Sequence, residues 1–143
     1  MGCVLQRYPL WVTIVPDGSG AVGKTEFEKD APPGGFRYLD QSEEKKRYIR
    51  IRVLIEVAGT IAHDLKFTGR AHDQGDAHDE HWARELIVES VSWEDDQEAY
   101  FEHTKQDGTA LLKENWHLVE AVAVALLQRQ TLAGAELLQI CRL

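Results

Sequence analysis

A cluster of imidazole and carboxylate side chains in the middle of the chain has the composition of a metal site. Its members are His72, Asp73, Asp76, His78, Asp79 and His81. Zinc favours such nitrogen and oxygen ligands, and His78 and His81 are three residues apart, on one side of an expected helix. This pair has no third ligand at a known fixed spacing and no cysteine nearby. A solvated helix start, where the helix dipole favours acidic residues, remains the alternative interpretation.

Asp79 is the member of this cluster with the strictest structural requirement. The apolar residues that follow it recur at spacings of three and four: Ala83, Leu86, Ile87 and Val91. One helical turn before this stripe, the same face carries Asp79. A carboxylate on the packed face of a helix is costly unless it meets a cation, a hydrogen-bond donor or a metal ion. We therefore expect Asp79 to bind a metal or to recruit His78, Lys66, Arg70 or a neighbouring chain.

A second motif, from Gly18 to Thr25, matches the phosphate-binding pattern G-x-x-x-x-G-K-[S/T]. In a true P-loop, backbone N–H groups and the start of the following helix bind the phosphates of a nucleotide. Here only a few residues, without an apolar stripe, separate Thr25 from the two prolines at 32–33. The favoured interpretation is a glycine-rich hairpin loop. Nucleotide binding is an alternative that requires a helix from Lys24 to about Asp30.

Composition restricts the class of protein. The chain has 143 residues, of which 43% are hydrophobic and 28% are charged, and a net charge of −8. These values predict one soluble domain and argue against nucleic acid or an anionic membrane surface as the main partner. The first residues are not basic and no apolar region follows them, so we expect a cytoplasmic protein. Cys3 and Cys141, at opposite ends of the chain, are expected to be reduced thiols.

The pattern of residues predicts a single, mainly helical domain over residues 1–143 with a small β-hairpin near the N-terminus. The β-rich run 10–15 ends at a Pro-Asp-Gly turn, and residues 23–27 are its expected partner. No apolar run is long enough to span a membrane. The expected regions are a hairpin over about 10–27, a loop over 28–41 and helices over 42–143.

The helical part contains one ambiguous segment. Isoleucine and valine alternate between Ile49 and Val57, which is typical of a strand, but a repeat of three and four continues to Leu65. Ser42 has the character of an N-cap. We therefore predict a helix over about 43–67, although Gly59 weakens it. Further helices are expected over about 77–91, from about 97 with a possible break at 107–108, after a cap at Asn115, and over 134–141.

Four blocks of the chain carry a resemblance to a known family. Residues 12–18 and 23–25 resemble the strand and turn V-T-I-x-P-R-G and G-x-T, with Asp17 in place of Arg. Residues 57–65 are similar to the helix L-G-G-R-A-A-E-E-L, and residues 75–83 to G-A-x-N-D-L-x-x-A. Residues 111–136 resemble the ending L-L-E-x-N to E-T-L-D-G-x-E. In this order the blocks resemble the peptidase domain of the FtsH family, the membrane-anchored AAA+ zinc metalloproteases; residues 92–107 match poorly.

The resemblance implies a zinc-dependent endopeptidase fold in which Asp79 is the third zinc ligand. The other two ligands and the general base would come from an H-E-x-x-H helix. An extended polypeptide substrate would be bound by strand addition along the hairpin edge formed by Val12, Thr13, Ile14 and Val15. No H-E-x-x-H occurs in the 143 residues, and neither does the family's ATPase module or membrane anchor.

Two explanations of the missing motif are open. The reading frame starts upstream, so that Met1 lies inside the helix, or the chain is a truncated relative that has lost the chemistry. As written, we expect no peptidase activity and weak zinc binding. The alternative function is a non-catalytic protein-interaction domain, with an apolar groove where the helix would pack and a homo-oligomer that fills it.

Overall fold

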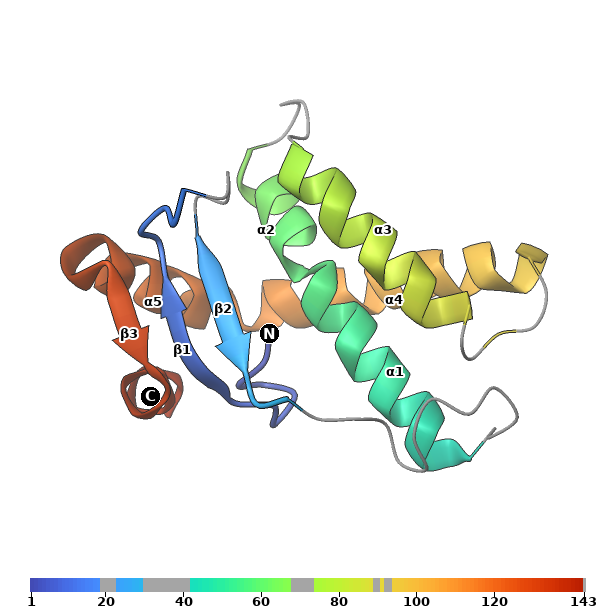
Figure 1. The fold of residues 1–143 in the computed structure, drawn as a ribbon, viewed down its shortest axis with the longest axis horizontal. Helices are drawn as coiled ribbons and strands as arrows, with labels where there is room; N and C mark the ends of the chain where they lie inside the picture. Colours follow the sequence, from blue (N-terminus) through green and yellow to red (C-terminus); the bar gives the residue numbers. More distant parts are fainter. Residues whose placement is uncertain (19–22, 30–41, 68–73, 89–90, 92–93, 143) are drawn as a thin grey trace. The chain divides into compact units, whose positions relative to one another are not determined.

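The computed structural model describes residues 1–18, 23–29, 42–67, 74–88, 91 and 94–142. It is mainly helical with a small antiparallel sheet formed by the two ends of the chain, which confirms the predicted fold class (Figure 1). The chain divides into two compact units. The sheet unit comprises Met1–Lys29 with Glu114–Leu143, and the helical unit comprises Asp30–Lys113. This division does not test the prediction that residues 1–143 form a single domain, which stays a prediction.

Three strands form the sheet: β1 (Pro9–Thr13), β2 (Lys24–Phe27) and β3 (Thr131–Ala133). Their order is β2-β1-β3, and both pairings are antiparallel. Val12 of β1 is opposite Thr25 on one side and Leu132 on the other. The β1–β2 hairpin was predicted from the sequence. Strand β3 was not, because three residues are too short to show an alternating pattern.

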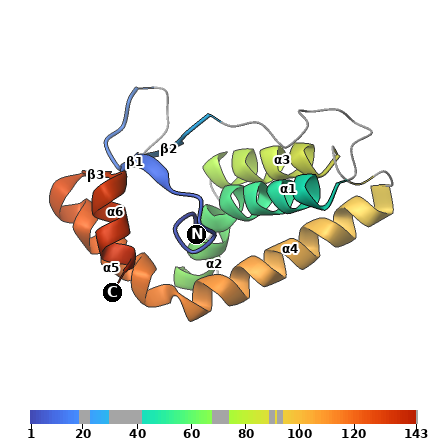
Figure 2. The same ribbon diagram turned by 90° about the horizontal axis from the view of Figure 1, so that it is seen from below.

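Two helices pack on one face of this sheet: α5 (Trp116–Arg129) and α6 (Gly134–Cys141) (Figure 2). Both were predicted, and α6 has the predicted bounds. Three leucines form the apolar cluster between helices and sheet, and partly buried residues surround them. The leucines are Leu126, Leu132 and Leu137, and the surrounding residues are Cys3, Val12, Val122, Ala125 and Ile140. The sheet unit is thus closed by residues from both ends of the chain.

The start of α6 lies against the backbone of β1. A Cβ atom built on Gly134 would lie 2.3 Å from the carbonyl oxygen of Pro9, closer than any real Cβ contact. Glu136 satisfies the backbone at this helix start, since its Oε2 accepts a hydrogen bond of 2.8 Å from the N–H of Ala133. Arg129 of α5 donates to the other carboxylate oxygen of Glu136 at 2.7 Å. Glycine is therefore required at position 134 for a close approach of helix and strand.

The helical unit contains α1 (Glu43–Glu56), α2 (Ala58–Lys66), α3 (Gln74–Val88) and most of α4 (Glu94–Glu114). Ser42 caps α1 as predicted, with its Oγ accepting a hydrogen bond of 3.3 Å from the N–H of Lys45. The predicted helix over 43–67 is present but is interrupted at Val57. The predicted break at 107–108 is wrong, because α4 continues through both residues. Among the described residues, no helix is both long and apolar enough to cross a bilayer.

The burial of α1 shows why the helical repeat prevails over the alternating one. Ile49, Val53 and Val57 recur every four residues and have no exposed surface. Ile51 and Ile55, which a strand would place on the same face, are only partly buried. A period of four buries one stripe of a helix, and this stripe belongs to the helix that packs mainly against α3 (Figure 1).

Substitution of Gly134 by Ala tests the close approach of α6 to β1. We expect Gly134→Ala to lower the free energy of unfolding by about 2 kcal/mol, since the new methyl group displaces backbone atoms. Gly59→Ala is the matched control, because a Cβ there would lie 3.7 Å from Oδ2 of Asp79, an ordinary contact. It should raise the free energy of unfolding by about 0.5 kcal/mol. Urea unfolding of both variants measures the difference, and equal effects would contradict the close approach.

Candidate functional site

Asp79 lies on the side of α3 that faces α2. Its carboxylate oxygen is the nearest atom to the site of a Cβ at Gly59, at 3.7 Å. The side chain is partly buried, and Ala83 and Ile87, one and two turns later, are 0% and 1% exposed. The carboxylate therefore belongs to the packed face of α3 and contacts α2 where that helix carries a glycine instead of a side chain.

The imidazoles near Asp79 have contacts of their own. The indole Nε1–H of Trp82 donates a hydrogen bond of 2.9 Å to Nε2 of His78, and the two rings meet edge to face. The ring centre of His81 is 6.0 Å from that of Trp82. All three side chains are exposed. His78 and His81 therefore flank a surface tryptophan on α3.

The described part of the chain contains no group of three or more His, Cys, Asp or Glu side chains arranged around one point. His72 and Asp73, two members of the predicted cluster, lie outside the described residues, as does Arg70. The described residues therefore offer one carboxylate of the zinc site that the resemblance implies, and not its remaining ligands.

The residues of the phosphate-binding pattern have a different structure from a P-loop. Lys24 and Thr25 belong to β2, where a P-loop requires the start of a helix. Nζ of Lys24 is 3.1 Å from the carboxylate of Glu26 and 5.6 Å from the ring centre of Trp11. Gly18 has a φ of +83°, which suits a turn; residues 19–22 lie outside the described residues. The nucleotide-binding alternative required a helix that begins at Lys24. A strand is found there instead, so this requirement is not met.

The predicted substrate-binding residues lie in and just after the central strand. Thr13 Oγ1 donates a hydrogen bond of 3.1 Å to the carbonyl of Gln130, and it lies 2.7 Å from Oγ1 of Thr131. The N–H of Ile14 also donates to the carbonyl of Gln130, at 2.9 Å. The free hairpin edge predicted for Val12, Thr13, Ile14 and Val15 is wrong, because β3 pairs with the side of β1 that β2 leaves open. Strand addition to this sheet would occur at β2 or β3.

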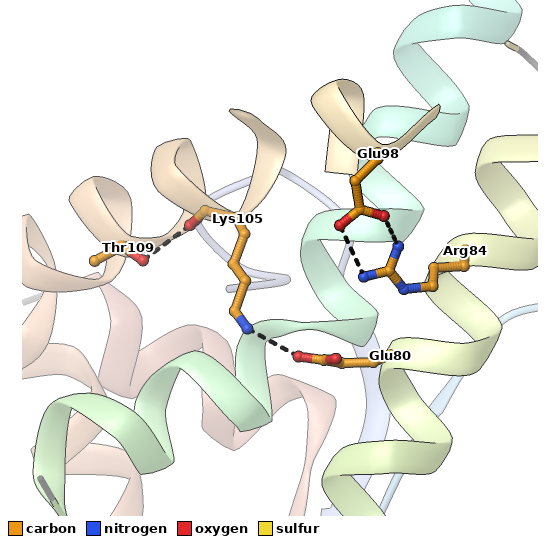
Figure 3. Close-up of polar contacts among 5 residues, drawn as sticks. All are labelled: Glu80, Arg84, Glu98, Lys105 and Thr109. Atoms are coloured by element: carbon orange, nitrogen blue, oxygen red, sulfur yellow. Dashed lines mark hydrogen bonds and ion pairs between the residues drawn. The ribbon is translucent and has the colours of Figure 1, made fainter. Parts of the chain in front are cut away.

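Ion pairs that were not predicted from the sequence join α3 to α4 (Figure 3). Both terminal nitrogens of Arg84 donate to the carboxylate of Glu98, with Nη2 3.3 Å from Oε1. Nζ of Lys105 donates to Oε1 of Glu80 at 2.8 Å. The guanidinium carbon of Arg84 also lies 4.0 Å from the ring centre of Phe101, which is 1% exposed. The cluster fixes α4 against α3 around one buried aromatic ring.

The Arg84–Glu98 pair changes the protonation of both groups. The hydrogen bonds from Arg84 hold the pKa of the Glu98 carboxyl below its ordinary value of 4.5. The same hydrogen bonds raise the pKa of Arg84. Glu80 and Arg84 are spaced four residues apart, so the sequence could show that they share a face of α3. Their partners on α4 follow only from the packing of the two helices.

The Arg84–Glu98 pair predicts a pH dependence of stability. A lowered carboxyl pKa means that the unfolded chain binds more protons, so the stabilisation is complete above about pH 6 and is lost as the pH falls through the native pKa of Glu98. The melting temperature of Glu98→Gln should lie below that of the wild type at pH 7, and the two should converge in acid. Glu114→Gln, which removes an exposed carboxylate from the same helix, is the control. A difference that persists unchanged in acid would contradict the assignment.

No protein-family model matches the sequence, and no curated protein matches it significantly. The resemblance to the FtsH peptidase domain therefore stays an expectation based on the four sequence blocks.

Proposed function

We propose that this chain is an FtsH-type peptidase-like domain in which Asp79 supplies one carboxylate ligand of a zinc site. The observation that carries the proposal is the approach of Asp79 of α3 to Gly59 of α2, where Oδ2 of Asp79 lies 3.7 Å from the position that a Cβ of residue 59 would occupy. Residues 57–65 and 75–83 are the two blocks that resemble consecutive helices of the family, and here they pack against each other at these two residues.

The residues present fit only part of a catalytic zinc site. Such a site takes three protein ligands and leaves the fourth position to water, which the metal makes acidic enough to attack a carbonyl. Asp79 supplies one oxygen ligand, and its partial burial limits competing hydration. The nearby His78 uses Nε2 to accept a hydrogen bond from Trp82. The two histidines and the general base of an H-E-x-x-H helix are not among the 143 residues, so hydrolysis is not expected of this chain alone.

Zinc binding by the chain and its variants tests the role of Asp79. We expect weak binding by calorimetry, and Asp79→Asn should weaken it about tenfold, because the amide offers a neutral ligand in place of a charged one. Glu85→Gln, which alters an exposed carboxylate on the same helix, should leave binding unchanged. Equal binding by wild type and Asp79→Asn would end the zinc assignment.

The DNA sequence of the gene tests whether an H-E-x-x-H motif completes the zinc site. In-frame translation of about 20 codons upstream of Met1 should contain H-E-x-x-H just before Met1, and a protein that begins there should bind zinc tightly and cleave peptides. A stop codon or an unrelated sequence at that place would end the enzyme proposal for this gene and would leave the interaction domain.

The second candidate, a non-catalytic protein-interaction domain, is supported by α5. Val124 and Leu127 are three residues apart on this helix and are 54% and 77% exposed. Neighbouring exposed apolar side chains on one helix face are typical of an interaction surface.

This candidate predicts self-association through α5. Sedimentation velocity should show a concentration-dependent dimer that Leu127→Lys converts to monomer, because the ammonium group cannot be desolvated at the contact. Gln128→Lys adds the same charge at the neighbouring exposed position and should leave the dimer intact. A wild type that remains monomeric at every concentration would contradict self-association through this face.

A further inference from the structure

The two cysteines of the chain belong to the same structural unit although nearly the whole sequence separates them. Cys3 packs against the apolar cluster of Leu126, Leu132 and Leu137. Cys141 follows Leu137 by four residues in α6 and therefore projects from the same face of that helix. Cys3 therefore packs beside the helix that carries Cys141.

Backbone hydrogen bonds fix the segment that carries Cys3. The N–H of Leu5 donates to the carbonyl of Met1 at 3.1 Å, and the N–H of Arg7 donates to the carbonyl of Gly2 at 2.9 Å. The N–H of Gln6 donates to the carbonyl of Cys3 itself at 3.3 Å. The guanidinium of Arg7 then stacks on the ring of Phe27 in β2, 5.3 Å from its centre. The position of Cys3 is thus tied to the sheet.

Cys141 lies close enough to Cys3 to act on its thiol. Burial raises the pKa of the Cys3 thiol, and its hydrogen bond with the Cys141 side chain raises it further, to about 11. Cys3 is therefore a neutral thiol at physiological pH. Both residues are only partly buried, so a small reagent can reach the pair from solvent.

We propose that Cys3 and Cys141 are a redox-active pair that forms a reversible disulfide between the segment before β1 and the end of α6. The oxidant that the pair would take is a small-molecule disulfide. This inference does not depend on the proposed zinc site, because both cysteines belong to the sheet unit and Asp79 belongs to the helical unit.

The chemistry is thiol–disulfide exchange in two steps. The thiolate of Cys141 attacks one sulfur of the reagent disulfide, forms a mixed disulfide and releases one reagent thiolate, which takes up a proton. The thiol of Cys3 then loses its proton and attacks the Cys141 sulfur, which releases the second reagent thiol and closes the protein disulfide. Two protein thiols are oxidised, and one reagent disulfide is reduced to two thiols.

The native fold should favour this bond over the same bond in an unfolded chain. Neighbouring thiols in a fixed structure have a high effective concentration, whereas thiols at the two ends of a long flexible chain have a low one. By linkage, a bond that is easier to form in the native protein stabilises the native protein by the same factor. The disulfide would thus stabilise the sheet unit, which is formed by both ends of the chain.

Equilibration of the full chain with mixtures of reduced and oxidised glutathione tests the proposal. After acid quenching and alkylation, mass spectrometry gives the fraction of protein that carries an internal disulfide. We expect the effective concentration of the pair to be at least about tenfold higher in native buffer than in 8 M urea. An equal or lower value in native buffer, or only disulfide-linked dimers, would overturn the inference.

Single cysteine variants and thermal unfolding provide two further tests. Cys3→Ser and Cys141→Ser should each form only the mixed disulfide with glutathione, and neither should form the internal bond. The oxidised wild type should melt at least about 3 °C above the reduced wild type, and an unchanged or lower melting temperature would overturn the inference. Asp79→Asn should leave this redox equilibrium unchanged, which separates a failure of the disulfide from a failure of the zinc proposal.

Discussion

Strand β1 is hydrogen-bonded on both sides, and the sheet unit depends on this pairing. On one side it pairs with the next strand in the sequence, and on the other with β3, from near the end of the chain. The second pairing brings α6 onto the backbone of β1 at Gly134. It also brings α6, which carries Cys141, to the apolar cluster against which Cys3 packs. A short local hairpin thereby becomes a closed layer with its own apolar cluster.

The same pairing bears on two predicted functions: phosphate binding by the glycine-rich segment and peptide binding along β1. Lys24 and Thr25 continue as a strand, so no helix start is available to bind a phosphate. The backbone of β1 has no free side for an incoming peptide, and only the outer sides of β2 and β3 remain. The eight-residue motif alone therefore did not predict phosphate binding correctly. Phosphate binding depends on the dipole and N–H groups of a helix that follows the motif, and here a strand follows.

The helical unit is organised by burial on one face of each helix, with ion pairs completing the contact of α3 with α4. The stripe from Ile49 to Val57 packs on α3, and Asp79 shares the packed face of α3 with Ala83 and Ile87. Arg84 bridges to Glu98 beside the buried ring of Phe101. Burial of apolar faces supplies most of the stabilisation of this unit, and the partly exposed ion pairs between α3 and α4 contribute less.

The elements whose signals are local could be predicted from the sequence. Capping at Ser42, the stripe through α1 and α3, the β1–β2 hairpin and the bounds of α6 all follow from periodicity and turn residues within a few positions. The sequence also placed Asp79 on the packed side of its helix. The pairings between distant segments could not be predicted and follow from the fold: β3 with β1, Arg84 with Glu98, and Asp79 with the helix that carries Gly59. The reason is physical, because a helix or strand pattern specifies which face is buried but not which partner covers it.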